Sequence, residues 1–589
     1  MGLDSFPIDD FFAEASDRLE GEFTMRKTHE KEERSEAKRQ GDSGTTYPEM
    51  LEINREMFNL PQTGLSDERR HQVLKQLLDY EIEQKNHFLG YQVNHDLHYQ
   101  DDLKKYLDFH VNNIGDPFAQ GNFTVNSKLA EQAVLDYYAR LWNAKWPHNP
   151  MDGDSYWGYV LSMGSSEGNI YGLWNARDYL AGKALITDPA LQLASSDASD
   201  TRHLVYHQPV TLPANPNAYV PIAFFSADTH YSIVKAMRVL EIPTFYDMGT
   251  RLYPHDCPLG KNTPWPTEVP SKDGPLGPGS INLEALQKLV AFFSEKGHPI
   301  LVSFNYGTTF KGAYDDVEEA GKMLLPIFEQ CGLDQRKVCY GKDKDNHDVC
   351  DTRTGYWFHV DGALGAGYMP FIEMAHAQKK ITERGPNFDF RLPMVHSLVM
   401  SGHKWAGAPW PCGIYMTRVK MQIKPPAKAE YIGSPDTTFA GSRNGLSPII
   451  LWNFLATHNY EEQIKAVLHA EDLCTYATSE LKKLGERLKK DIWVQRSPLA
   501  LTVRFKAAHP DIIKKYSLSG ETLAKRQYSH IFTMRSVTRE LIDALICDLG
   551  KPGGIPDQKP TTGEEATTIE LAEVAHPLIA VPISGRGFK

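Results

Sequence analysis

Short apolar runs separated by helical periodicity organise the chain between about residues 155 and 420. Six of these runs have the length and composition of buried strands: "YWGYVLSM", "YVPIAFFSA", "PILVSFN", "YWFHVD", "HSLVMS" and "CGIYM". Helical spacing instead marks two segments between them, "NLEALQKLVAFFSEK" and "DDVEEAGKMLLPIFEQ". This alternation predicts an α/β fold with a mostly parallel sheet covered by helices. Ligands bind such sheets at the carboxyl ends of strands, so the residues after each run are the candidates for function.

The regions on either side follow other patterns. Residues 26–46 are almost all polar and of mixed charge, so we expect residues 1–60 to be a mobile leader. From Ser66, "SDERRHQVLKQLLDYEIEQ" combines an N-cap serine, first-turn acids and an apolar stripe, which predicts a helix with a partner surface in an N-terminal segment at 61–110. A large domain that contains the six apolar runs is expected at 111–445. The helical "EEQIKAVLHAEDLCTYATSELKKLGERL" and strand-like "LALTVRF" predict a small C-terminal α+β domain at 446–589, with a loose linker, "GKPGGIPDQKPTTGEEATT", before "HPLIAVPIS".

Composition narrows the class of partner. The chain has 589 residues and a net charge of -12, which argues against general affinity for nucleic acid or an anionic membrane, because both need excess Lys and Arg. The start, "MGLDSFPIDDFF", lacks the basic region and apolar core of a signal peptide, and no window resembles a membrane span. The seven cysteines are widely spread without C-x-x-C spacing, which predicts free thiols. We therefore expect a cytoplasmic protein with a small-molecule partner.

Several residues that follow the predicted strands have functional side chains. Ser165 and Ser166 lie in a small turn that opens a helix, which suits a phosphate but also an ordinary cap. His230 begins a helix and Thr308 lies in a turn, and both have equally plain structural interpretations. Asp361 ends an apolar run, where an unpaired carboxylate is costly.

Lys404, in "MSGHKW", completes the set. A single loop lysine usually points into water, but a desolvated amine has a lowered pKa and can attack a carbonyl carbon. A phosphate cradle, a histidine, a carboxylate and a lysine at successive strand ends suit an aromatic cofactor that carries a phosphate, an aldehyde and a basic ring nitrogen. These groups predict pyridoxal 5′-phosphate.

The motifs "SMGSSEGNIYGL", "DTHYSIVKA", "NYGTTFKGAYDD", "HVDGA", "SGHKWAGAPWPCG" and "GSRNG" occur in this order over roughly residues 90–460. In this arrangement the chain resembles the group II pyridoxal phosphate-dependent amino-acid decarboxylases of fold type I. It looks most like the branch with serine and histidine decarboxylases and valine and methionine decarboxylases. The resemblance implies a homodimer with active sites at the subunit interface.

The resemblance also implies a role for each residue that matches a motif. Lys404 would bind the cofactor covalently and return a proton to the substrate carbon, and Asp361 would pair with the ring nitrogen, with Thr308 supporting it. His230 would stack on one ring face and Ala363 on the other. The phosphate would be held by Ser165, Ser166, Ser401 and His403.

Other expectations concern the substrate side of the site. Tyr431 is the candidate loop acid, although the segment before "GSRNG" is shorter than in aromatic decarboxylases. Asn112, Asn113 and Phe118 would line the substrate mouth, yet a structural turn explains this stretch equally well. The insertion at 335–355 contains "DKDNHD", which lacks the glycine and distal glutamate of a calcium loop, so we expect a solvated surface loop and no metal.

Three functions remain open. The first is decarboxylation of an amino acid to an amine, with a neutral hydrophobic substrate (valine, leucine or methionine) favoured over histidine, serine or aromatic amino acids. The second keeps the cofactor but makes an aldehyde or another product; the presence of both His230 and Tyr431 argues against this. The third is a cofactor-free binding module, which Lys404 and Asp361 argue against.

Overall fold

The computed structural model describes residues 55–183, 208–422 and 428–557. Most of the predicted leader at 1–60, much of the predicted linker and the run "HPLIAVPIS" lie outside the described residues. The chain divides into two compact units, residues 1–86 and 87–589, which are described separately. No helix in the described ranges is both long enough and apolar enough to cross a membrane.

The first unit contains the predicted N-terminal helix, α2 (Asp67–Asn86). Ser66 caps it by accepting a hydrogen bond from the Arg69 N–H at 3.2 Å, so the predicted start is confirmed. Leu74 and Leu78 on this helix are 52% and 57% exposed. The partner surface expected for this apolar stripe stays a prediction.

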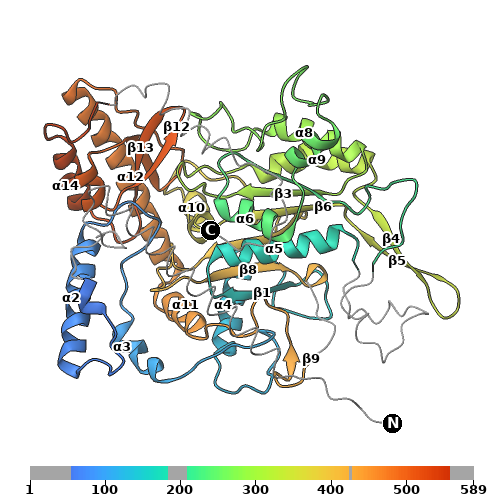
Figure 1. Ribbon diagram of the computed structural model, residues 1–589, viewed down its shortest axis with the longest axis horizontal. Helices are drawn as coiled ribbons and strands as arrows, with labels where there is room; N and C mark the ends of the chain where they lie inside the picture. Colours follow the sequence, from blue (N-terminus) through green and yellow to red (C-terminus); the bar gives the residue numbers. More distant parts are fainter. Residues whose placement is uncertain (1–54, 184–207, 423–427, 558–589) are drawn as a thin grey trace, which may run out of the picture. The chain divides into compact units, whose positions relative to one another are not determined.

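A six-stranded sheet forms the centre of the second unit (Figure 1). Its strand order is β1-β8-β7-β6-β3-β2. Strands β2, β3, β6 and β7 run parallel to one another, while β8 runs antiparallel to both β7 and β1. The predicted mostly parallel sheet is confirmed, with each strand formed by one of the six apolar runs: β1 (Tyr156–Leu161), β2 (Ile222–Phe225), β3 (Ile300–Asn305), β6 (Tyr356–Asp361), β7 (Val395–Ser401) and β8 (Gly413–Arg418).

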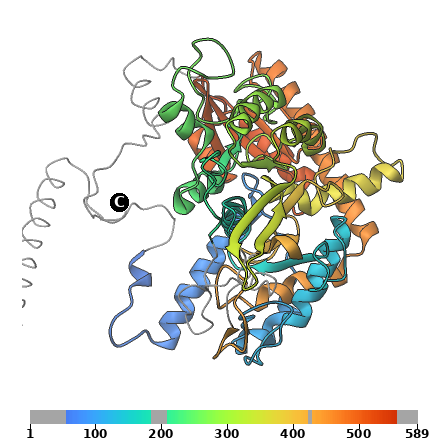
Figure 2. The same cartoon turned by 90° about the vertical axis from the view of Figure 1, so that its right-hand side faces the viewer.

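Helices cover both faces of this sheet (Figures 1 and 2), because alternate residues of each strand enter different cores. Val302 of β3 belongs to the core that includes residues of α4 (Lys128–Leu141), α7 (Phe245–Leu252), α8 (Leu283–Glu295), α9 (Val317–Gln330) and α10 (Gly365–Ala377). Its neighbour Leu301 packs in the opposite core with residues of α5 (Ser165–Leu180) and α6 (Tyr231–Leu240). The two faces are therefore both buried, as the continuous apolar runs predict.

The C-terminal part has the expected α+β composition. The long helix α12 (Tyr460–Leu488) begins with a capping box formed by Asn459 and Glu462. A three-stranded antiparallel sheet and two helices contribute residues to a core with α12. The predicted domain boundaries stay a prediction. Apart from a hairpin formed by residues 336–353, the other α-helices and β-strands of the described residues are α3 (Gln100–Leu103), β9 (Lys428–Ala429), β10 (Ser434–Pro435), α11 (Leu446–Thr457), β11 (Thr502–Lys506), α13 (Pro510–Lys515), β12 (Ser519–Leu523), β13 (Arg526–Phe532) and α14 (Arg539–Leu549).

The insertion at 335–355 differs from the prediction of a solvated loop. It forms a hairpin of β4 (Arg336–Lys342) and β5 (Asp348–Arg353). Cys339 and Cys350 face each other in this hairpin and form a disulfide, so the prediction of free thiols is wrong for these two cysteines. The pairing was missed because a spacing of 11 residues matches no cysteine motif, and only the register of the two strands brings the sulfurs together.

Candidate active site

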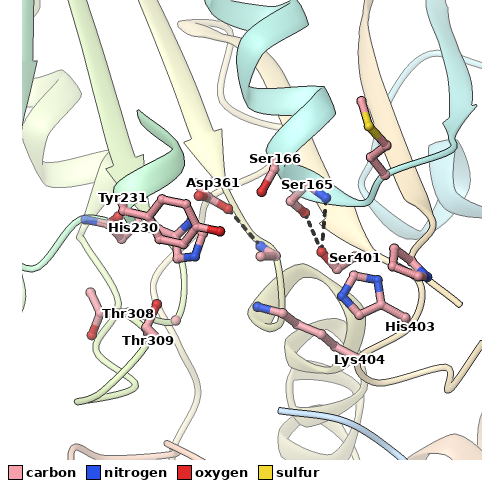
Figure 3. A pocket seen from close by; sticks show the side chains of 15 residues that line it. Ser165, Ser166, His230, Tyr231, Thr308, Thr309, Asp361, Ser401, His403 and Lys404 are labelled. Atoms are coloured by element: carbon pink, nitrogen blue, oxygen red, sulfur yellow. Dashed lines mark hydrogen bonds between the residues drawn. The ribbon is translucent and has the colours of Figure 1, made fainter. Parts of the chain in front are cut away.

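The side chains predicted to hold the cofactor come from the carboxyl ends of five strands of the central sheet, β1, β2, β3, β6 and β7. They surround a cavity of about 260 Å³, with His230 and Tyr231 on one side and Ser401 and His403 on the other (Figure 3). The lining residues include all of the residues predicted for the cofactor: Ser165, Ser166, His230, Thr308, Asp361, Ala363, Ser401, His403 and Lys404.

One wall of the cavity is the start of α5. Gly164 precedes the helix with φ of 69° and ψ of -164°, a conformation that is essentially restricted to glycine. A Cβ at this position would lie 2.7 Å from Cε1 of His403. Ser401 accepts a hydrogen bond from the Ser165 N–H at 3.1 Å, and its hydroxyl lies 2.8 Å from the Ser165 hydroxyl. A helix start with serine hydroxyls beside it suits a phosphate group.

Lys404 presents its amine to the same cavity. Its Nζ donates to Oε1 of Gln92 at 2.6 Å. Burial lowers the pKa of Lys404 to about 8, and the charge of Asp361 partly opposes this shift. A lower pKa leaves more of the amine unprotonated near neutral pH, which is the form that attacks a carbonyl carbon. The surroundings of Lys404 therefore favour a reactive amine over an ordinary loop lysine.

Asp361 is the last residue of β6 and is buried. Its Oδ1 accepts from the Ala363 N–H at 3.1 Å, and its Oδ2 accepts from Nδ2 of Asn169 at 2.8 Å. Because each carboxylate oxygen has two lone pairs, the group can still accept a hydrogen bond from a ligand in the cavity.

His230 is the N-cap of α6, and its Nδ1 accepts from the Ser232 N–H at 3.3 Å. Burial is the main cause that lowers the pKa of His230, and Asp361 opposes the shift while Lys404 adds to it. The ring is therefore neutral near pH 7. A flat, uncharged ring at the cavity wall suits contact with an aromatic ligand.

Four other predicted residues do not line this cavity. Tyr431 is 77% exposed. Asn112 and Asn113 are buried and hold neighbouring backbone and side-chain groups through hydrogen bonds. Phe118 stacks on His148 with ring centroids 3.7 Å apart. The functional roles predicted for Tyr431, Asn112, Asn113 and Phe118 stay predictions.

Comparison with known proteins identifies the family. Residues 268–486 match the model of the pyridoxal-dependent decarboxylase conserved domain. Histidine decarboxylase from Solanum lycopersicum is 30% identical over 480 residues, which is 81% of this chain and 87% of that protein. The chain belongs to the group II pyridoxal phosphate-dependent decarboxylases. Serine decarboxylase 1 from Oryza sativa subsp. japonica is 27% identical over 469 residues, 80% of this chain and 73% of that protein.

The solved structures agree with this assignment. L-methionine decarboxylase from Streptomyces sp. 590, in complex with L-methionine methyl ester, superimposes with a TM-score of 0.79 at 44% identity. The match covers 86% of this chain and 99% of that enzyme. The decarboxylase described here is therefore a carboxy-lyase of fold type I, and its cofactor is pyridoxal 5′-phosphate.

The residues that line the cavity fit this cofactor. When bound, pyridoxal 5′-phosphate supplies an aldehyde that reacts with amines and a ring that accepts the electron pair left when carbon dioxide departs. Lys404 is the amine that lines the cavity, Asp361 could accept a hydrogen bond from the ring nitrogen, and the start of α5 with Ser165 suits the phosphate. The neutral ring of His230 presents an uncharged surface on its side of the cavity.

Two residues at this site were missed in the sequence. Gln92 contacts the amine of Lys404, and Asn169 contacts the carboxylate of Asp361. Gln92 lies outside any strand end, so nothing in the pattern pointed to it. Asn169 did leave a signal, because asparagine is a poor helix former and this one lies one turn after Ser165, on the same face of α5.

Proposed function

We propose that this decarboxylase acts on a neutral hydrophobic amino acid, with L-methionine the first candidate and valine and leucine the next, and releases carbon dioxide and the corresponding amine. The observation that carries the proposal is the 44% identity to L-methionine decarboxylase over nearly the whole of that enzyme. The histidine decarboxylase from Solanum lycopersicum and the serine decarboxylase from Oryza sativa are less similar to this chain, at 30% and 27% identity.

The charges around the cavity support a neutral side chain. Among the described residues that line it, Lys404 is the single Lys or Arg, and that amine is needed for the cofactor. Burial lowers the pKa of His403 to about 4, so this histidine is also neutral. A substrate with a second carboxylate would find no free cation there, whereas Met163 and Pro411 offer apolar contact.

The residues of this chain then take the following proposed roles. Lys404 binds the cofactor covalently, and Asp361 holds the proton on the ring nitrogen. Tyr431 is the first candidate to return a proton to the substrate carbon, with Lys404 as the alternative. His230 and Ala363 contact opposite faces of the ring. The phosphate is held by Ser165, Ser166, Ser401 and His403, and Thr308 supports the carboxylate of Asp361.

The test is a substrate panel with a paired variant. Purified enzyme with cofactor is given each of the twenty amino acids, and carbon dioxide, amine, aldehyde and peroxide are measured. We expect methionine to give the highest kcat/KM, equal amounts of amine and carbon dioxide, and no turnover in Lys404→Ala. Greater kcat/KM for histidine or serine would contradict the substrate, and stoichiometric aldehyde would contradict simple decarboxylation.

A homodimer also belongs to this proposal. The apolar stripe of α2 leaves Leu74 and Leu78 half exposed, and a second copy of the chain would cover such a surface. Sedimentation at micromolar concentration should give twice the chain mass. A fully active monomer would contradict this. The cytoplasmic location stays a prediction, to be checked by fractionation of cells that produce the protein.

A further inference from the structure

A chain of hydrogen bonds lies directly behind the cavity, and Asn169 is at its centre. This buried residue of α5 donates through Nδ2 to Oδ2 of Asp361 at 2.8 Å and to Oγ of Ser232 at 2.9 Å. Its Oδ1 lies 2.9 Å from Nε2 of His359. One side-chain amide therefore contacts the carboxylate at the strand end and, through Ser232, the ring of His230.

The direction of these bonds follows from the chemistry of the groups. A carboxylate only accepts, so the NH₂ group of Asn169 must face Asp361 and its oxygen must face His359. His359 therefore carries a proton on Nε2. Complete burial lowers the pKa of His359 to about 4, so the ring is neutral and its Nδ1 is an acceptor. Ser397 lies 2.8 Å from that nitrogen and is its donor.

The same reasoning fixes the ring of His230. Oγ of Ser232 accepts from Asn169, so its own hydroxyl proton is free to point to Nδ1 of His230, 2.7 Å away. The Ser232 N–H points to the same nitrogen and can only donate. Nδ1 of His230 therefore has no proton, and the neutral ring carries its proton on Nε2.

We infer that Asn169 is a positioning residue that holds Asp361 toward the ring nitrogen of the cofactor and, through Ser232, sets the tautomer of His230. The inference rests on the roles proposed above for Asp361 and His230. An aspartate at position 169 has the same shape but cannot donate to two acceptors, and an aliphatic side chain can make none of the three contacts. Asparagine satisfies all of them at once.

The decisive variant is Asn169→Asp, and α5 offers a matched control. Asn175 is buried in the same helix and donates to the Met421 carbonyl and to the Tyr415 hydroxyl, away from Asp361 and His230. Asn175→Asp therefore places the same change in the same helix without altering the hydrogen bonds of Asn169. A difference between the two variants reports the contacts of Asn169 rather than a buried charge in α5.

The first measurement is the absorbance of the bound cofactor as a function of pH, together with its dissociation constant. In Asn169→Asp we expect a displaced titration midpoint and about 10- to 100-fold weaker binding, by analogy with the loss of a residue that orients a metal ligand. Asn175→Asp should keep the wild-type midpoint. Equal midpoints and affinities in the two variants would overturn the inference for Asp361.

The second measurement is the tautomer of His230, from the ¹⁵N chemical shifts of labelled histidine, with His230→Gln used to assign its signals. Wild type should show the proton on Nε2. Ser232→Ala removes the hydroxyl donor while the contact between Asn169 and Asp361 remains, so it should alter the His230 signals and leave the cofactor midpoint unchanged.

These readouts are independent of the substrate. If Asn169→Asp fails to fold, Ser232→Ala still tests the contact from Asn169 through Ser232 to His230. Unchanged His230 signals in that variant would refute the inference. If wild type decarboxylates no amino acid in the panel while the His230 signals respond as expected, the proposed function fails and the positioning role stands. If wild type is active and the signals do not respond, only the positioning role fails.

Discussion

Replacing Gln92 by leucine should make the amine of Lys404 easier to deprotonate. In the native enzyme burial lowers the pKa of Lys404 to about 8, and Oε1 of Gln92 accepts from its Nζ at 2.6 Å. This acceptor stabilises the ammonium form more than the free amine, because a hydrogen bond to a charged group is stronger than one to a neutral group. Without it the ammonium form loses support and the pKa falls further.

The size of the shift follows from the energy of such a bond. A hydrogen bond that involves a charged group contributes about 1.5–3 kcal/mol. A bond between neutral groups contributes about 0.5–1.5 kcal/mol, so the ammonium form loses about 1–1.5 kcal/mol more than the free amine. One pKa unit corresponds to about 1.4 kcal/mol, so Gln92→Leu should lower the pKa of Lys404 by about one unit. Gln92→Glu gives the opposite change, because a carboxylate at the same place attracts the ammonium and should raise the pKa.

Competitive labelling of the cofactor-free enzyme measures this pKa directly. Acetic anhydride reacts with free amines, and mass spectrometry of the peptide with Lys404 gives the extent of reaction at each pH. We expect a midpoint of about 8 in wild type, a lower one in Gln92→Leu and a higher one in Gln92→Glu. One midpoint shared by all three proteins, or a wild-type midpoint at the ordinary lysine value of 10.5, would refute the reasoning.

Three further changes test other contacts. Lys311 and Asp228 form an ion pair at 2.7 Å, with side chains 2% and 15% exposed, and Lys311→Met removes the cation. The free energy of unfolding in urea should fall by about 3 kcal/mol, and a fall of less than about 1 kcal/mol would contradict a buried pair. Cys339→Ser removes the disulfide with Cys350 and should speed proteolysis within 336–353 while kcat stays unchanged. Equal rates of proteolysis in wild type and variant would contradict a stabilising disulfide. Tyr431→Phe should slow amine formation about 10²- to 10⁴-fold if this residue is the general acid, and an unchanged rate would leave that role to Lys404.

The pattern of apolar runs was sufficient to predict the central sheet, because strands buried on both faces are apolar throughout and leave a strong signal. The residues at the ends of those runs could be predicted equally well, since Asp361 is the last residue of β6 and Lys404 lies three residues after β7. Pairings between distant segments could not be predicted from the sequence pattern. The partner of Cys339 depends on the hairpin register, and Asn169 becomes informative only when folding places it beside Asp361. Sequence pattern records local periodicity but does not record which buried amide meets which carboxylate.

Because the cavity draws on separate strand ends, its completion must come late in folding. The hydroxyls of Ser165 and Ser401 are 236 positions apart in the chain, and Asn169 and Asp361 are 192 apart. Contacts at such separations form slowly, since the entropy of closing long loops is lost before the contacts can compensate for it. Nearly the whole sheet must be in register before the amine, the carboxylate and the serine hydroxyls surround one space. The rate of cofactor binding during refolding therefore reports the final step of folding. Cofactor binding should be slower than the recovery of the helical circular dichroism signal.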